Sequence, residues 1–275
     1  MLINLRLEVL KVMRKPRTYI GPVALSLLII AMLVGMKHGH DFEYMRHRLE
    51  QDFIVTGSFL NAAFLTRYLL EGITFTFLPL FACMVCGDLL ASEAADGTLR
   101  MLLCRPVTRL KVAVSKYAIA IMYVLGLTLG TGLLSYLAGW GYLGRGSLVV
   151  LQKGVWIYPE HEAILRILGA YILIACGMIA LGSIAFAVST FLSNSNGAIA
   201  AAMGLLYGSA VIGEIQYFAK IKPYLLTTQV EMWRSFFWGT PDAHAIAKAV
   251  GILAAYSVVS LVIGLIIFSR RDVLS

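Results

Sequence analysis

Histidine and acidic side chains that could bind a metal ion gather in two parts of this sequence. In the polar stretch 37–67 the candidates are His38, His40, Asp41, Glu43 and His47. Their spacing matches no firm set of metal ligands. The second part is the pair His161–Glu162, but a zinc-peptidase helix needs a second histidine at the position of Leu165. Solvated loops are therefore the preferred interpretation, and a membrane-embedded enzyme with an outer-surface His/Glu site stays an alternative.

Thiols and phosphate-binding loops offer no better candidates for catalysis. Cys83 and Cys86 form a C-x-x-C pair, but they fall inside an apolar run, where packing is the simpler role. Cys104 and Cys176 also lie in or near apolar segments or on the predicted cytoplasmic side, which argues against a disulfide framework. The chain has no G-x-x-x-x-G-K-[ST] motif for ATP phosphates. We expect no catalytic residue, metal or cofactor in this chain.

The composition is typical of a protein surrounded by a lipid bilayer. Hydrophobic residues make up 59% of the 275 residues and charged residues only 14%, whereas a soluble domain carries about 25% charged residues. The net charge of +8 could favour nucleic acid, but the basic residues lie in short loops beside apolar runs, as in proteins oriented in a membrane. We therefore expect no nucleic-acid partner.

The apolar residues form six runs, and about 20 such residues cross a bilayer. The runs cover about residues 19–36, 72–90, 112–140, 167–192, 197–213 and 245–268. They predict an all-α integral membrane protein in which residues 1–275 form a single transmembrane domain. Pro79 predicts a kink within the second span. The aromatic connection 214–244 is expected to hold short helices at the membrane interface.

The first eighteen residues form a different kind of helix. Asn4, Glu8, Lys11 and Lys15 recur at steps of three or four, so they share one face, and apolar residues occupy the other. The segment 1–18 is predicted to be an amphipathic helix that lies on the membrane surface. Pro16 is predicted to end the helical part of this segment. A simple basic anchor before the first span is the alternative.

Six spans place both termini on one side of the membrane. Lys and Arg are denser in residues 1–18, 88–117, 193–196 and 269–275 taken together than in the connections on the other side. Because basic residues accumulate on the cytoplasmic side, both termini are predicted to be cytoplasmic in a multi-pass plasma (inner) membrane protein.

The stretch 88–116 is the long polar segment between the second and third spans. Gly97 and Thr98 interrupt one helix and start another, Pro106 stops that short helix, and Thr108 can cap the next span. Residues 91–109 are therefore predicted to form a helical elbow that protrudes from the membrane. Its acidic residues come first and its basic residues follow, so it carries charges that another protein could pair with.

The order of residues in this elbow resembles the cytoplasmic signature of the permease subunits of type-2 ATP-binding-cassette exporters. The matching residues are Glu93, Gly97, Thr98, Leu99, Leu102, Leu103, Pro106, Val107, Thr108, Arg109 and Lys116. The ending Phe268, Arg270, Arg271 and Asp272 is also similar to that family. The resemblance extends over the whole chain, with an amphipathic start, six spans and one elbow between spans two and three.

The resemblance implies that the elbow is a coupling helix. Such a helix docks into a soluble ATPase, which binds the ATP and Mg²⁺, and two permeases (a homodimer or close homologues) work with two ATPases. The coupling residues would be Glu93, Gly97, Thr98, Leu99, Arg100, Leu102, Leu103, Arg105, Pro106 and Arg109. The chain itself would hydrolyse nothing. ATP-driven export across the plasma membrane is the expected function.

Spans two and five are implied to line the central path at the dimer interface. The residues beside the substrate would be Thr74, Thr76, Phe77, Phe81, Ala201, Leu205 and Ser209. Ala200, Gly204 and Gly208 recur at steps of four and let another helix approach closely, either within one subunit or between two. A mechanical transmitter that acts on an extracytoplasmic partner remains a further possibility.

Overall fold

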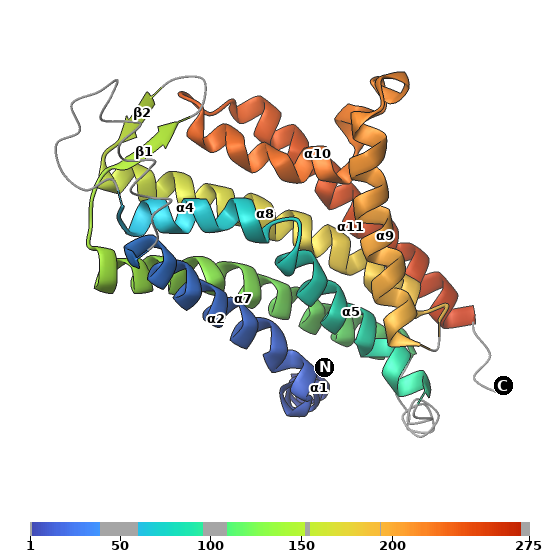
Figure 1. The fold of residues 1–275 in the computed structure, drawn as a ribbon. Helices are drawn as coiled ribbons and strands as arrows, with labels where there is room; N and C mark the ends of the chain where they lie inside the picture. Colours follow the sequence, from blue (N-terminus) through green and yellow to red (C-terminus); the bar gives the residue numbers. More distant parts are fainter. Residues whose placement is uncertain (1, 39–59, 96–108, 152–154, 193, 271–275) are drawn as a thin grey trace.

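The computed structural model describes residues 2–38, 60–95, 109–151, 155–192 and 194–270. These residues form a bundle of long helices (Figure 1). The long helices are α1 (Leu2–Arg14), α2 (Pro16–His38), α4 (Ala62–Ile73), α5 (Phe77–Ala95), α7 (Arg109–Leu143), α8 (Glu160–Ser189), α9 (Ser195–Glu214) and α11 (Ala243–Arg270). The first residue of α2 is Pro16, at a position where proline is well accommodated because no helical N–H is needed there.

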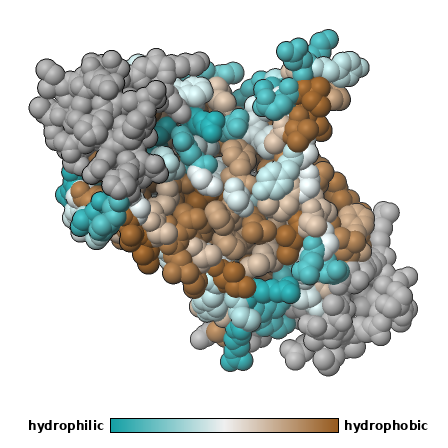
Figure 2. All heavy atoms as spheres, in the orientation of Figure 1, coloured by the Kyte–Doolittle hydropathy of each residue, from teal (hydrophilic) through white to brown (hydrophobic). Residues whose placement is uncertain are grey.

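The lengths and compositions of these helices bear out an all-α integral membrane protein. Within the described residues, α2, α7, α8, α9 and α11 are each long and apolar enough to cross a bilayer. The bent pair α4–α5 passes the same test when it is counted as one further span. Figure 2 shows hydrophobic side chains across the middle of the visible face and hydrophilic ones towards its ends.

The second span differs from the expected continuous helix at 72–90 with a kink at Pro79. The chain instead forms α4 and α5, which meet at a 61° bend after a break at Thr74–Thr76. Pro79 is the third residue of α5, where its missing N–H disrupts nothing. The helical region therefore begins at Ala62, although Arg67 and Glu71 made this segment resemble the end of a polar loop.

Helix α8 is the central helix of the bundle. Of the five described helices that are each long enough to cross a bilayer it has the largest buried share, and α5, α7, α9 and α11 all pack against it. Its glycines allow close contacts: a Cβ on Gly182 would lie 2.9 Å from the sulfur of Cys86 in α5. Cys83 and Cys86 are both buried free thiols, as expected for packing residues.

The connection between α7 and α8 contains a β-hairpin in place of the expected open loop. Strands β1 (Leu148–Leu151) and β2 (Val155–Tyr158) pair antiparallel, with Leu148 opposite Tyr158. Helix α8 also begins earlier than the span expected at residue 167. We call the end of the bundle that carries this hairpin the hairpin end; Figure 1 shows it at the upper left.

Short helices fill the connection between α9 and α11, as expected from its aromatic sequence. They are η1 (Gln216–Phe218), η2 (Lys222–Tyr224), α10 (Leu226–Glu231) and η3 (Met232–Phe237). Trp233 and Phe237 of η3 are fully buried, and η3 packs on α8. A Cβ on Gly169 of α8 would lie 2.4 Å from the ring of Phe236, so this contact depends on the absence of a side chain.

Substitution of Gly139 in α7 can test how closely α7 approaches α4. A Cβ at Gly139 would lie 2.8 Å from the Cα atom of Ala62, which is backbone and cannot move alone. Gly139→Ala is expected to lower the free energy of unfolding by about 1–3 kcal/mol. Gly130→Ala on the same helix meets no atom within 4 Å and should be neutral or stabilising by up to about 1 kcal/mol. Equal unfolding temperatures of the two purified variants in detergent would contradict this packing.

Candidate functional site

The predicted elbow lies between α5 and α7. Helix α5 includes the backbone of Glu93 and ends at Ala95, and α7 begins at Arg109. The remaining predicted coupling residues, from Gly97 to Pro106, lie outside the described residues, and the coupling role of the elbow stays a prediction. Residues 88–95 and 109–116 flank this segment. We call this end of the bundle, which includes α1, the elbow end (Figure 1).

Asp88 of α5 is the centre of a charged cluster at the elbow end. Its side chain is 7% exposed and accepts hydrogen bonds from Lys15 Nζ at 2.7 Å and Arg17 NH1 at 2.8 Å. Ser195 Oγ, at the start of α9, donates a third at 2.7 Å. Lys15 also donates to Ser92 Oγ, one turn after Asp88. Asp88 therefore joins the α1–α2 junction and α9 to the helix that leads into the elbow.

A second ion pair joins α1 to the helix that leaves the elbow. Lys116 of α7 is 1% exposed, and its Nζ lies 3.0 Å from Oε2 of Glu8. Lys11 Nζ approaches the other oxygen of Glu8 at 3.3 Å, but the Lys11 side chain is half exposed. The amphipathic pattern placed Glu8 on a polar face, whereas the structure buries it, because α1 packs on α7.

The surroundings of Glu8 favour its charged form. Burial raises the pKa of the Glu8 carboxyl, and the neighbouring Lys116 and Lys11 ammonium groups lower it by more, so the pKa lies below its usual 4.5. A lowered carboxyl pKa means that the pair stabilises the fold above the ordinary pKa and that this contribution is lost as the pH falls through the lowered value. The pair is therefore fully formed at neutral pH.

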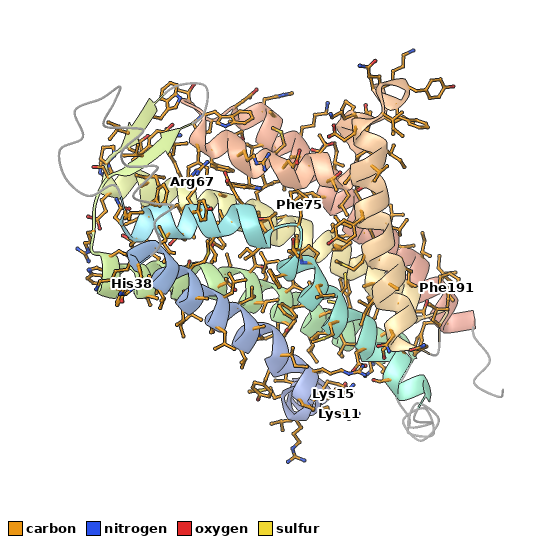
Figure 3. The ribbon with its side chains drawn as sticks, viewed as in Figure 1. Lys11, Lys15, His38, Arg67, Phe75 and Phe191 are labelled. Atoms are coloured by element: carbon orange, nitrogen blue, oxygen red, sulfur yellow. The ribbon has the colours of Figure 1, made fainter. Side chains whose placement is uncertain are left out.

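These contacts connect the helices at the elbow end rigidly to one another. The helix that enters residues 96–108 and the helix that leaves them are each bonded to the N-terminal region through a buried charge. Removing one partner from such a pair leaves an uncompensated buried charge, which costs about 3–5 kcal/mol. A force on residues 96–108 would therefore reach α5, α7 and α1 together. Figure 3 shows Lys11 and Lys15 at this end, beside α1 and α5.

The residues expected beside the substrate occupy two different environments. Thr74 and Phe81 are buried, and Thr74 Oγ1 donates to the carbonyl of Leu70 in its own chain segment. The rings of Phe77 and Phe81 stack with their centroids 6.4 Å apart, and Thr76 is exposed. The α9 residues are more open: Leu205 is 56% exposed, and Ala201 and Ser209 are half-buried. Helices α5 and α9 are neighbours, but these seven side chains do not share one surface, and the path stays a prediction.

The small-residue stripe of α9 is not covered by any of the described helices. A Cβ built on Gly204 or on Gly208 meets no atom within 4 Å, and Ala200 is exposed. The same helix packs on α5 through other residues: a Cβ on Gly87 would lie 3.4 Å from the Cβ of Ala198. The stripe therefore contributes nothing to the described intrachain packing.

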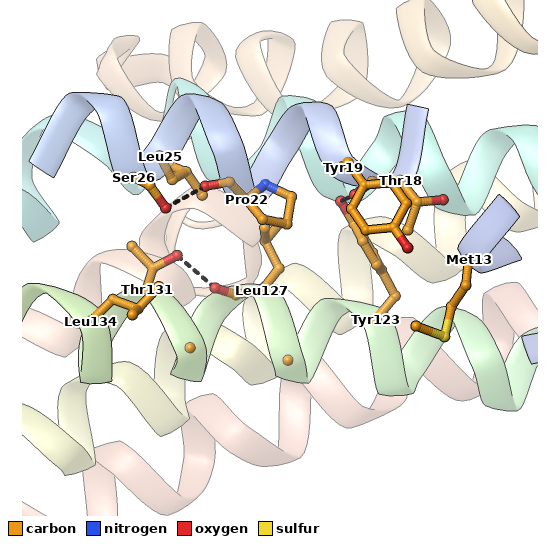
Figure 4. A pocket seen from close by; sticks show the side chains of 12 residues that line it. Met13, Thr18, Tyr19, Pro22, Leu25, Ser26, Tyr123, Leu127, Thr131 and Leu134 are labelled. Atoms are coloured by element: carbon orange, nitrogen blue, oxygen red, sulfur yellow. Dashed lines mark hydrogen bonds between the residues drawn. The ribbon is translucent and has the colours of Figure 1, made fainter. Parts of the chain in front are cut away.

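An apolar groove of about 260 Å³ lies between α2 and α7 (Figure 4). Four hydroxyl groups on its wall, those of Thr18, Ser26, Tyr123 and Thr131, each donate to a backbone carbonyl. Gly126 and Gly130 lie along its α7 side. The groove is thus mainly apolar, and the Tyr19 hydroxyl is a further polar group in its lining.

The alternative enzyme site receives no support from the described residues. His161 is exposed in the first turn of α8, and Glu162 is bound by Arg166 at 2.7 Å. No group of three possible metal ligands occurs in the described part of the chain. His40, Asp41, Glu43 and His47 lie outside it.

The residues of the charged cluster were each visible in the sequence but were not connected. Asp88 and Lys116 are the first and last charged residues of the polar stretch, and Glu8 and Lys15 were assigned to an amphipathic face. The signal in the sequence was that each end of the polar stretch has a charged residue directly beside an apolar span. Pairing over 71 to 108 residues, however, depends on helix packing.

The helical architecture and its apolar surfaces define a multi-pass membrane protein. Comparison with known families then gives the assignment: residues 4–273 match the family described as ABC-2 family transporter protein, and the chain belongs to that family. In this family the chain is a membrane component of a transporter, and ATP hydrolysis lies in a separate subunit. The chain is also similar to Uncharacterized protein YhcI of Bacillus subtilis (strain 168), with 24% identity over 214 residues, 75% of this chain and 68% of that protein.

The Glu8–Lys116 pair can be tested by exchange of its charges. Glu8→Gln and Lys116→Gln should each lower the free energy of unfolding by about 3 kcal/mol, because each removes one charge of a buried ion pair. The double variant Glu8→Lys/Lys116→Glu should recover part of that loss. Lys11→Gln is the matched control and should cost less than about 1 kcal/mol, since this side chain is half exposed. Additive losses in the double variant, measured by thermal unfolding in detergent, would argue against the pair.

Proposed function

We propose that this chain is the permease subunit of an ATP-driven exporter in the plasma membrane, and that residues 91–109 couple it to a separate soluble ATPase. The observation that best supports this is the pair of buried charges on the two helices that flank the elbow. Asp88 in α5 and Lys116 in α7 are both bonded to the N-terminal region. A segment that only connects two spans has no need of such rigid flanks.

The proposed mechanism is rigid-body transmission. The ATPase binds ATP and Mg²⁺, and its closure displaces the elbow, where Arg100, Arg105 and Arg109 pair with its charges and the leucines fill a groove. Because α5 and α7 are joined to α1, the displacement tilts them as a unit and alternates access to a path between two permease copies. The elbow must lie in the cytoplasm for this mechanism, together with both termini.

The second copy is proposed to pack along α9. Gly204 and Gly208 are uncovered in one chain, and small residues four apart allow the backbones of two helices to approach closely. Contact there would bring Leu205 of each copy to the dimer interface, next to the proposed path. The exposed apolar surface of α9 suits an amphipathic or lipid-like substrate.

The coupling role predicts a specific failure when the elbow is altered. Arg105→Glu and Glu93→Ala should reduce recovery of the co-expressed ATPase at least about tenfold, because a charge-assisted contact contributes about 1.5–3 kcal/mol, or should abolish its stimulation. Membrane insertion and yield should not change. Lys220→Glu reverses an exposed charge remote from the elbow and should have no effect. Normal copurification and normal coupled ATPase activity in both elbow variants would refute the coupling role.

The proposed dimer predicts a cross-link at the stripe. In a variant without native cysteines, Gly204→Cys should form an intermolecular disulfide on mild oxidation in native membranes. Gly251→Cys on α11, which also meets no atom within 4 Å, is the matched control and should remain monomeric. Equal cross-linking at the two positions, measured by non-reducing electrophoresis, would exclude a specific interface at α9.

A further inference from the structure

Three buried N–H groups towards the hairpin end have no hydrogen-bond acceptor among the residues that the structure describes. They are Arg67 Nε in α4, and Trp233 Nε1 and Arg234 Nε in η3. Arg67 is 7% exposed and Trp233 is fully buried. Buried donors are almost always paired in folded proteins, because an unpaired donor has lost its water without compensation. Three of them on two adjoining elements need an explanation.

The three groups belong to one cluster built on an aromatic pair. The rings of Trp233 and Phe237 lie 6.0 Å apart in an edge-to-face arrangement. The guanidinium carbon of Arg67 lies 5.3 Å from the centre of the Phe237 ring, and that of Arg234 lies 5.7 Å from the centre of the Trp233 ring. Two positive groups from α4 and η3 therefore flank the same pair of rings. Figure 3 shows where Arg67 lies beside α4.

The charges of this cluster do not balance within the described residues. Arg67 NH2 donates to Glu71 Oε1 at 3.1 Å, which neutralises one arginine. The neighbouring Arg166 is fully engaged, since it bonds Glu162 and the carbonyl oxygens of Phe236 and Gly239. Arg234 makes no ion pair or hydrogen bond with any described residue, and it is half-buried, so it reaches the surface. The cluster thus carries one positive charge in excess.

We propose that Arg67, Trp233 and Arg234 bind a phosphate group, which accepts hydrogen bonds from their unpaired N–H groups. Guanidinium groups match the geometry of phosphate oxygens, and the indole N–H can only donate, so all three groups require an acceptor. The phosphate belongs either to a phospholipid headgroup or to a free phosphate ion. The fully buried aromatic pair excludes water beneath the anion, which strengthens the attraction.

The experiment uses the full chain in a non-ionic sugar detergent, which contains no phosphate. Phosphatidylglycerol, a neutral diacyl glycolipid and inorganic phosphate are added separately, and the shift in unfolding temperature is measured against concentration. Arg234→Gln is the main variant, because Arg234 has no ion pair to lose. Arg67→Lys keeps the charge but removes the planar donor group. Arg145→Gln is the matched control, since Arg145 is a surface arginine that is 53% exposed and packs on Trp140.

Phosphatidylglycerol or inorganic phosphate should stabilise the unaltered chain and Arg145→Gln, while the neutral glycolipid should not. The apparent affinity should fall at least about tenfold in Arg234→Gln and in Arg67→Lys, as expected from the loss of a charge-assisted hydrogen bond. Stabilisation by the lipid alone identifies a headgroup, and stabilisation by inorganic phosphate identifies a soluble anion. No stabilisation by either, or equal stabilisation in Arg234→Gln, would overturn the proposal. The result is independent of the ATPase, so failure here would leave the exporter proposal untouched.

Discussion

A buried charge must have a partner, and this requirement organises the end of the molecule on which the proposed function depends. Removing Asp88 and Lys116 from water is unfavourable unless oppositely charged groups meet them, and these groups come from the first seventeen residues. The α1–α2 junction is thereby held against α5, and α1 is held against α7. Helix α1 therefore packs on α7 as part of the bundle, and its location at the membrane surface stays a prediction.

The two ends of the bundle differ in how completely their buried polar groups are paired. At the elbow end, Asp88 accepts three hydrogen bonds from charged or hydroxyl groups, and its charge is more than balanced. Near the hairpin end, Arg67, Trp233 and Arg234 each retain a buried N–H group without an acceptor. A satisfied cluster stiffens a structure, whereas an unsatisfied one is suited to an added ligand. The stiff end is where force is proposed to enter, and the unsatisfied end is where an anion is proposed to bind.

Between these ends, glycine determines how closely the helices approach. Among the described elements, helix α8 contacts the long helices α4, α5, α7, α9 and α11, and positions such as Gly169 and Gly182 leave no room for a Cβ. In a bilayer, lipid tails are as apolar as leucine, so close packing rather than the hydrophobic effect holds helices together. A Cβ on Gly204 or Gly208 of α9 would meet no described atom within 4 Å, which is why these glycines are the best candidates for contact with a second copy.

The sequence by itself determined the membrane class, the helical spans and the family, because apolar runs of about 20 residues and the order of residues in the elbow are local properties. The sequence did not reveal the break at Thr74–Thr76 or the start of α4. Arg67 and Glu71 are charged and so resemble loop residues, and only the structure shows that they form an ion pair across one turn of α4. Only the tertiary structure decided which charges meet, because the partners of Asp88 lie more than seventy residues away in the chain. Periodicity shows that a residue belongs to a face, but the neighbour of that face depends on how the helices pack.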